Sequence, residues 1–253
     1  MTRPAPRHLR AAAAMLTFLA VALAPSAAEA RATPDGPDYG SPQVGECHQL
    51  TMDDAASASD TSAPTDCAQS HTTRVIAVGH LPTRYAWSNQ DAVERVAIRA
   101  CVPALDEALG RTDRVRDVSA YSWLYFRPTR AQRDHGARWI RCDLLLLGGA
   151  RLLRLPTDTT PALGRSPLPN GVARCLTGRT FSTTACSRSH AFRATGTFTV
   201  DAATYPGARR LDRAAARRCP SHVSSTAFRW TYRTGLRWNL GDHVVVCYTR
   251  TGD

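Results

Sequence analysis

At 253 residues the chain is long enough for one or two domains, and a hydrophobic content of 43% excludes an intrinsically disordered protein. All 32 basic residues are arginine, and the formal net charge of +11 favours anionic partners, with a soluble charged surface that has no dedicated partner as an equal alternative. Among anionic partners, wall polymers and lipid headgroups fit better than nucleic acid if the chain leaves the cytoplasm.

The first 30 residues have the three-part layout of a secretory signal peptide. Three arginines and no acid lie within residues 2–10, an apolar run follows at 11–24, and Ala28-Glu29-Ala30 fits the small-x-small cleavage pattern. We predict cleavage after Ala30 and an extracytoplasmic protein, with an uncleaved anchor as the alternative. The apolar run is shorter than the ~20 residues that span a bilayer. No later stretch is long and apolar enough to span a membrane, so no transmembrane span is expected once the signal is removed.

Eight cysteines in an exported chain indicate a disulfide framework. They form two sets of four that share landmarks in the same order. In both sets the second cysteine begins a Cys-x3-His motif, a proline closely follows the third, and the fourth ends a Gly-x5-Cys segment. The sets are Cys47, Cys67, Cys101 and Cys142, then Cys175, Cys186, Cys219 and Cys247. We interpret them as a tandem duplication, with pairing inside each copy: Cys47–Cys67, Cys101–Cys142, Cys175–Cys186 and Cys219–Cys247.

This duplication and the composition define the expected domains. Residues 156–170 are rich in Pro, Thr, Ser and Gly, as linkers are, and 31–44 are similarly rich in Pro and Gly. We therefore predict a signal peptide at 1–30, a flexible tail at 31–44, a first copy at 45–150, a linker at 151–170 and a second copy at 171–253.

Each copy is expected to follow the order β-α-β-β, which makes the fold class α+β, with a mixed or antiparallel sheet and one main helix. A capping box at Ser88 and Asp91 opens the first helix, and Pro103 should break or kink it. Strand patterns precede and follow the helices, and the last strand of each copy carries the fourth cysteine. The expected strands lie at 74–79, 121–126, 192–200 and 227–232, and the second helix lies at 207–218.

One run of sequence resembles a known family. Residues 128–142, PTRAQRDHGARWIRC, follow a Cys-x3-His motif and resemble the septum formation domain family, as does Tyr205-Pro206-Gly207 before the helix that leads to Cys219. The resemblance covers nearly all of 45–253. It implies an exported or membrane-tethered protein of a high-GC Gram-positive bacterium, with a link to division or the envelope. It implies no reaction.

His71 and His190, which end the two Cys-x3-His motifs, are the candidate functional histidines. We expect core histidines that hydrogen-bond to the backbone beside a disulfide, and a ligand-binding or proton-sensing role is the alternative. Cysteine and histidine are also zinc ligands, so a zinc-stabilised module is a further alternative, although an oxidising compartment argues against it. No catalytic motif is found, and no catalytic residue, metal or cofactor is predicted.

Arginines alternate with aromatic residues at 121–130 and 228–238. We favour strands with one packed face over a surface that binds nucleic acid or glycans. The function expected from the sequence is a non-catalytic envelope or extracellular protein that binds a cell-wall polymer or an envelope protein, and no nucleic acid. The alternative from another class is a secreted hydrolase whose site lies between the two copies. The oligomeric state is left open.

Overall fold

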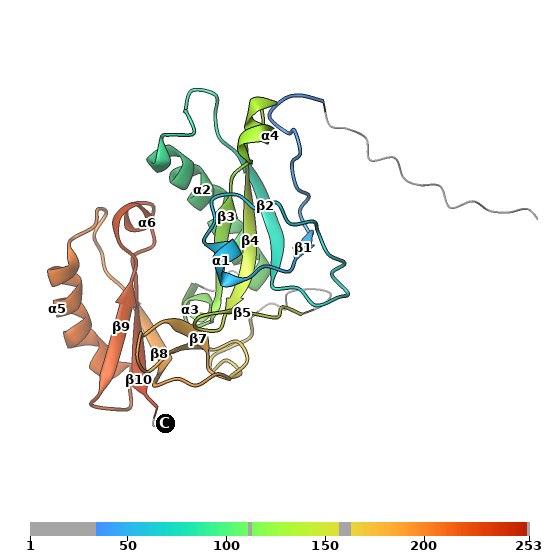
Figure 1. Cartoon of the computed structure of the whole chain (residues 1–253). Coiled ribbons are helices and arrows are strands. Elements are labelled where there is room, and N and C mark those ends of the chain that lie inside the picture. Colours follow the sequence, from blue (N-terminus) through green and yellow to red (C-terminus); the bar gives the residue numbers. More distant parts are fainter. Residues whose placement is uncertain (1–33, 111–112, 157–162, 252–253) are drawn as a thin grey trace, which may run out of the picture. The chain divides into compact units, whose positions relative to one another are not determined.

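The computed structural model describes residues 34–110, 113–156 and 163–251, apart from the side chain of Asp113. The signal peptide predicted at 1–30 lies outside the described residues. The described chain forms two five-stranded antiparallel sheets (Figure 1). The first contains β1 to β5, which belong to the first half of the chain, and the second contains β6 to β10, which belong to the second half. Each sheet carries one long helix, which gives the α+β fold expected from the sequence.

In the first sheet the strands run in the order β1-β2-β4-β3, and β5 pairs with β4. The central strand β4 is buried on both faces because its side chains alternate between two apolar layers. Ile140, Leu144 and Leu146 pack in the core cluster that contains the buried face of α2, whereas Leu145 packs on the other face. The strands are β1 (Cys47–His48), β2 (Thr73–His80), β3 (Tyr121–Phe126), β4 (Trp139–Leu147) and β5 (Leu152–Leu153).

The second sheet has the order β7-β6-β8-β10-β9. Its central strand β10 alternates in the same way: Val245 packs with Leu211 of helix α5, and Val246 and Tyr248 pack in a separate cluster. The strands are β6 (Arg174–Leu176), β7 (Thr183–Ala185), β8 (Phe192–Thr199), β9 (Phe228–Tyr232) and β10 (Val244–Arg250).

The helices differ in length and in role. The two long ones, α2 (Gln90–Leu109) and α5 (Ala208–Arg218), each lie beside a sheet (Figure 1). Each helix also has a stripe of buried residues. The remaining ones are single turns that connect strands: α1 (Met52–Ala55), α3 (Asp113–Asp117), α4 (Arg130–Asp134), η1 (Cys219–Ser221) and α6 (Gly235–Asn239). None of the helices in the described ranges is both long and apolar enough to cross a membrane.

Helix α2 differs from the prediction at both ends. Its N-cap is Asn89, whose side-chain oxygen accepts from the backbone N–H of Ala92 at 3.0 Å, and not Ser88. Pro103 does not end the helix, which continues for six more residues to Leu109. A proline removes one helical hydrogen bond. Leu105 and Leu109, 6% and 1% exposed, offset that loss by burial in the core.

Part of the segment predicted as a flexible tail at 31–44 contacts the first sheet. Residues 34–42, which we call the N-terminal strap, are held to the first half by side-chain contacts that composition does not predict. The indole N–H of Trp139 donates to the carbonyl of Tyr39 at 3.0 Å. Two further contacts pair Asp38 with His80 at 2.6 Å and Asp35 with His135 at 2.9 Å.

The linker predicted at 151–170 is also more ordered than expected. Leu155 is 2% exposed in the first core cluster, and Leu168 is 4% exposed in the second. Backbone hydrogen bonds join the two halves nearby, from Ala120 N–H to the Val172 carbonyl at 2.7 Å and from Arg174 N–H to the Val118 carbonyl at 2.8 Å. Isolated leucines in a Pro- and Thr-rich segment therefore anchor that segment, Leu155 to the first core cluster and Leu168 to the second.

Candidate functional site

The four disulfides join the pairs predicted from the sequence: Cys47–Cys67, Cys101–Cys142, Cys175–Cys186 and Cys219–Cys247. No cysteine in the structure is free. The Cys101–Cys142 bridge connects the middle of α2 to the central strand β4, and the Cys219–Cys247 bridge connects the end of α5 to the central strand β10. The other two close loops at the start of each half. All eight sulfurs therefore serve the scaffold, and none is available as a thiol nucleophile.

The candidate histidines occupy related positions but differ in burial. His71 is 1% exposed, and its Nδ1 lies 3.0 Å from the carbonyl oxygen of Gln69. The Nδ1 of His190 lies 2.7 Å from the carbonyl oxygen of Arg188, and its ring is half-buried. Both rings thus contact backbone two residues earlier, as expected for histidines beside a disulfide. Neither contact assigns a function.

His190 also lies in a group of possible metal ligands with Cys175 and Cys186, whose ligand atoms are all within 4.8 Å of one another. The two sulfurs are bonded to each other, and zinc is bound by thiolates. The group could hold a metal only after reduction of that bond. The site is therefore incompatible with zinc in the oxidised protein.

A buried polar network that was not predicted from the sequence is built on β4. Arg141 makes a bidentate pair with Asp143, at 2.8 and 2.9 Å, and a further bond to Asp60 at 2.7 Å. His48, 2% exposed, completes it, with Nε2 at 3.3 Å from Arg141 Nη1 and Nδ1 at 3.2 Å from Ser62 Oγ. The signal was the pair Arg141 and Asp143 in an apolar strand, two residues apart and hence on one face.

The geometry of this network opposes a serine–histidine catalytic role. A guanidinium only donates, so His48 Nε2 is the acceptor and Nδ1 carries the proton. The hydroxyl of Ser62 donates to Asp60 at 2.9 Å, so its proton is not directed at an imidazole base. Burial, with the charge of Arg141, lowers the pKa of His48 to about 4. The ring is neutral at neutral pH, and the network holds the loop at 51–66 onto the sheet.

That loop forms one wall of a groove of about 350 Å³, which is the candidate functional site. The opposite wall is β3, with Trp123 and Tyr125, and continues to Arg127 just beyond the strand. The loop is fixed in place because the N–H of Arg127 donates to the carbonyl of Ala58 at 3.0 Å. Arg237, from α6 in the second half, closes the groove.

The charges of the groove are unbalanced. Among the residues that line it, two are arginines, Arg127 and Arg237, and none is acidic. The Nε atom of Arg127 is buried and has no hydrogen-bond partner among the described residues. Burial, followed by the charge of Arg233, lowers the pKa of Arg237. Arginine nevertheless stays charged at any physiological pH, so the groove holds two cations without a facing counter-ion.

A second, polar cavity of about 160 Å³ adjoins the groove between the two halves. A small cavity of about 30 Å³ lies between them, since it shares Trp123 and Arg237 with the groove and Arg233 and Asp242 with the polar cavity. Arg233 pairs with Asp242 there at 3.4 Å. Burial raises the pKa of Asp117 to about 6, although the charges of Arg116, Arg174 and Arg233 oppose that rise. The polar cavity, unlike the groove, therefore contains its own counter-charges.

The segments that interleave arginine with aromatic residues contain both core residues and residues that line the groove. Trp123 and Phe126 are 7% and 0% exposed and pack in cores, as the favoured interpretation predicted. Tyr125, Arg127 and Arg237 instead line the groove. Sequence alone did not bring 121–130 and 228–238 together, because they belong to different halves of the chain.

Comparison with known proteins identifies the family. No curated protein and no solved structure matches the chain. A family model described as septum formation matches residues 44–247, which include both sets of cysteines, the groove and the polar cavity. Because that match covers most of the 253 residues, the chain belongs to the septum formation family.

Proposed function

We propose that this protein is an exported, non-catalytic component of the cell envelope that binds a cell-wall polymer. We propose further that it is built from two tandem copies of one disulfide-stapled domain. The observation that carries the proposal is the groove formed by Trp123, Tyr125, Arg127 and Arg237, in which two cations face no acid. Two cations without a facing acid favour an anionic ligand, which supports a binding role for the groove.

Two features support the duplication. In the first half the strands β2-β4-β3 lie side by side, and in the second half β8-β10-β9 follow the same order. In each half, a disulfide ties the segment of the long helix to the central strand, through Cys101–Cys142 and Cys219–Cys247. A shared order of strands and a shared crosslink are expected of copies of one ancestral domain.

Export is supported by the leader pattern at 1–30 and by the disulfides. Four disulfides with no free cysteine in the structure are typical of proteins that fold in an oxidising compartment. Cell fractionation with N-terminal sequencing tests this point. The expected product begins at Arg31 and lies outside the cytoplasm, and a cytoplasmic product with an intact leader would contradict export.

Binding is tested with purified sacculi, the insoluble walls of the producing bacterium. The oxidised protein should co-sediment with sacculi that keep all their polymers. An unrelated exported protein of equal net charge should stay in solution as the control. If the protein does not co-sediment with intact sacculi at low salt, the wall-binding proposal is wrong.

The hydrolase with a site between the two halves has weaker support. The polar cavity contains Asp117, Ser122 and Asp242 but no histidine or cysteine among its lining residues. A hydroxyl there has no base of suitable pKa other than a carboxylate. A screen of peptide, ester and glycan substrates with the wild type and an Asp117→Asn variant would detect such an activity.

A further inference from the structure

We propose that the groove is a subsite for one anionic sugar unit of a glycan chain, with the anionic group held by Arg127 and Arg237 and the sugar ring placed on Tyr125. The inference rests on the proposed wall-binding function and names the ligand of the same site. The shared chemistry is a sugar that carries a phosphate or a carboxylate group.

The first argument is the state of the two guanidinium groups. Neither Arg127 nor Arg237 makes a side-chain hydrogen bond or an ion pair with any described residue, and the Nε of Arg127 is buried without a partner. A buried donor without a partner costs free energy, and a charged donor costs more than a neutral one. An anion in the groove would satisfy these donors, because guanidinium groups bind phosphate and carboxylate through two parallel hydrogen bonds.

The second argument is the charge around the groove. Two acids act on it from outside: the charges of Asp242 and then of Glu94 oppose the lowering of the pKa of Arg237, and the charge of Glu94 helps burial to raise the pKa of Tyr125. Glu94 does not line the groove, and neither does any other carboxylate. In the polar cavity, by contrast, Asp242 pairs with Arg233. An anion that enters the polar cavity would therefore have to displace Asp242 from Arg233. An anion that enters the groove would displace no carboxylate from the lining residues.

The third argument is the aromatic wall. The rings of Trp123 and Tyr125 lie 6.5 Å apart, tilted by 36°. The guanidinium of Arg237 covers Trp123 at 4.4 Å, whereas Tyr125 is half-buried and borders the groove. Aromatic rings provide a rigid apolar surface with a polar edge, which suits the C–H face and the hydroxyls of a sugar. A groove of about 350 Å³ lies within the range of small-ligand sites and accommodates one such unit.

The experiment measures binding of the oxidised protein to soluble polymers at low salt. The probes are a phosphodiester-linked glycan, a uronate-containing glycan and neutral dextran, together with vesicles that contain an anionic lipid. We expect binding to one or both charged glycans and none to dextran. Comparison of the affinities for the phosphodiester-linked and the uronate-containing glycan then shows whether the groove binds phosphate, carboxylate or both.

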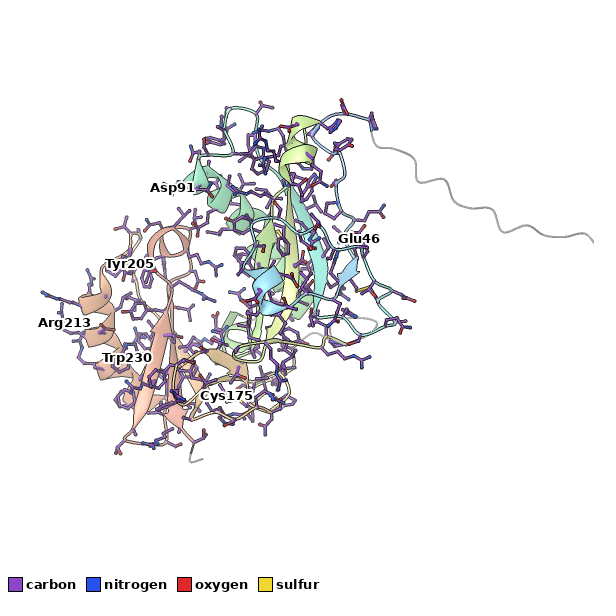
Figure 2. All side chains as sticks on the ribbon, viewed as in Figure 1. Glu46, Asp91, Cys175, Tyr205, Arg213 and Trp230 are labelled. Carbon is purple, nitrogen blue, oxygen red and sulfur yellow. A yellow bond between two sulfur atoms is a disulfide. The ribbon has the colours of Figure 1, made fainter. Side chains whose placement is uncertain are left out.

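The variants locate the site. Arg127→Gln should weaken binding at least about tenfold, the effect of losing one charged hydrogen-bonded pair. Arg213→Gln removes the same charge from the exposed side of α5 (Figure 2) and should leave the affinity unchanged. Tyr125→Ala should also weaken binding, and Tyr125→Phe, which keeps the ring, should not. Equal thermal unfolding of the variants shows that each is folded.

Several results would overturn the inference: equal affinities for Arg127→Gln and Arg213→Gln, equal binding of dextran, or binding to vesicles alone. Sacculi stripped of their anionic polymers separate this inference from the proposed function. Retention on stripped sacculi with unchanged affinity would contradict the anionic sugar subsite but leave wall binding intact. Failure on intact sacculi would contradict both.

Discussion

The guanidinium carbon of Arg237 lies 4.4 Å from the centroid of the Trp123 ring. Arg237 belongs to α6 of the second half, and Trp123 belongs to β3 of the first. Around them, Leu236 and Leu240 of the same helix region pack against the core cluster of the first half. The contact therefore closes the groove and helps to join the two halves of the fold.

Replacement of Arg237 by Gln should lower the free energy of unfolding by about 1 kcal/mol, because a cation–π contact that is partly removed from water is lost. Urea unfolding measures the change, with Arg213→Gln as the matched control. An effect no larger than that of the control would show that the contact does not stabilise the protein.

The disulfides should differ in their effect on stability according to the length of chain they close. The Cys101–Cys142 bridge spans 41 residues and the Cys175–Cys186 bridge spans 11. Chain-entropy arguments give about 4 kcal/mol for the first and about 3 kcal/mol for the second. Paired Cys→Ala variants, compared by equilibrium unfolding, should show this order, and the reverse order would contradict the entropic account.

Protonation of His48 should destabilise the protein in mild acid. Its pKa is lowered to about 4 by burial and by the charge of Arg141, against about 6.5 in an unfolded chain. The unfolded state therefore binds more protons between these values, and stability falls as pH falls from 6.5 to 4, by up to about 1.4 kcal/mol per pH unit. The stability of a His48→Gln variant should fall less steeply over this interval, and parallel profiles would rule out His48 as the cause.

Asp117 should act in the opposite direction over a similar interval. Its pKa is raised to about 6 by burial, so the folded state keeps the proton longer than the unfolded state does. Its contribution to stability is present below about pH 4 and is lost as pH rises through 6. The Asp117→Asn variant should therefore gain stability relative to the wild type as pH rises from 4 to 7. A constant difference across that range would contradict the raised pKa.

Much of the scaffold could be predicted from the sequence because its signals are local or repeated. The matched spacing of the cysteines indicated the four pairs, and β-branched and aromatic residues located the strands at 74–79 and 121–126 inside β2 and β3. These features need only a short window of sequence. They do not depend on which distant segment packs against them.

Contacts between distant segments could not be predicted from composition. The N-terminal strap looks like a tail, yet Trp139, about 100 residues later, anchors it through the Tyr39 carbonyl. The polar loop at 51–66 contains Asp60, which is held by Arg141 at 2.7 Å. Arg237 and Trp123 meet only because the two sheets associate. No short stretch of sequence predicts contacts between residues that lie this far apart in the chain.

The most direct test of the account is NMR of the five indole N–H groups during titration with a solubilised charged wall glycan. Trp123 lines the groove, whereas the indoles of Trp139 and Trp230 donate to Tyr39 and Asp212 away from it. The account predicts that the Trp123 resonance shifts with saturation, that Trp139 and Trp230 stay unchanged, and that Arg127→Gln suppresses the shift. Saturable shifts of Trp139 or Trp230 with Trp123 unchanged would contradict it.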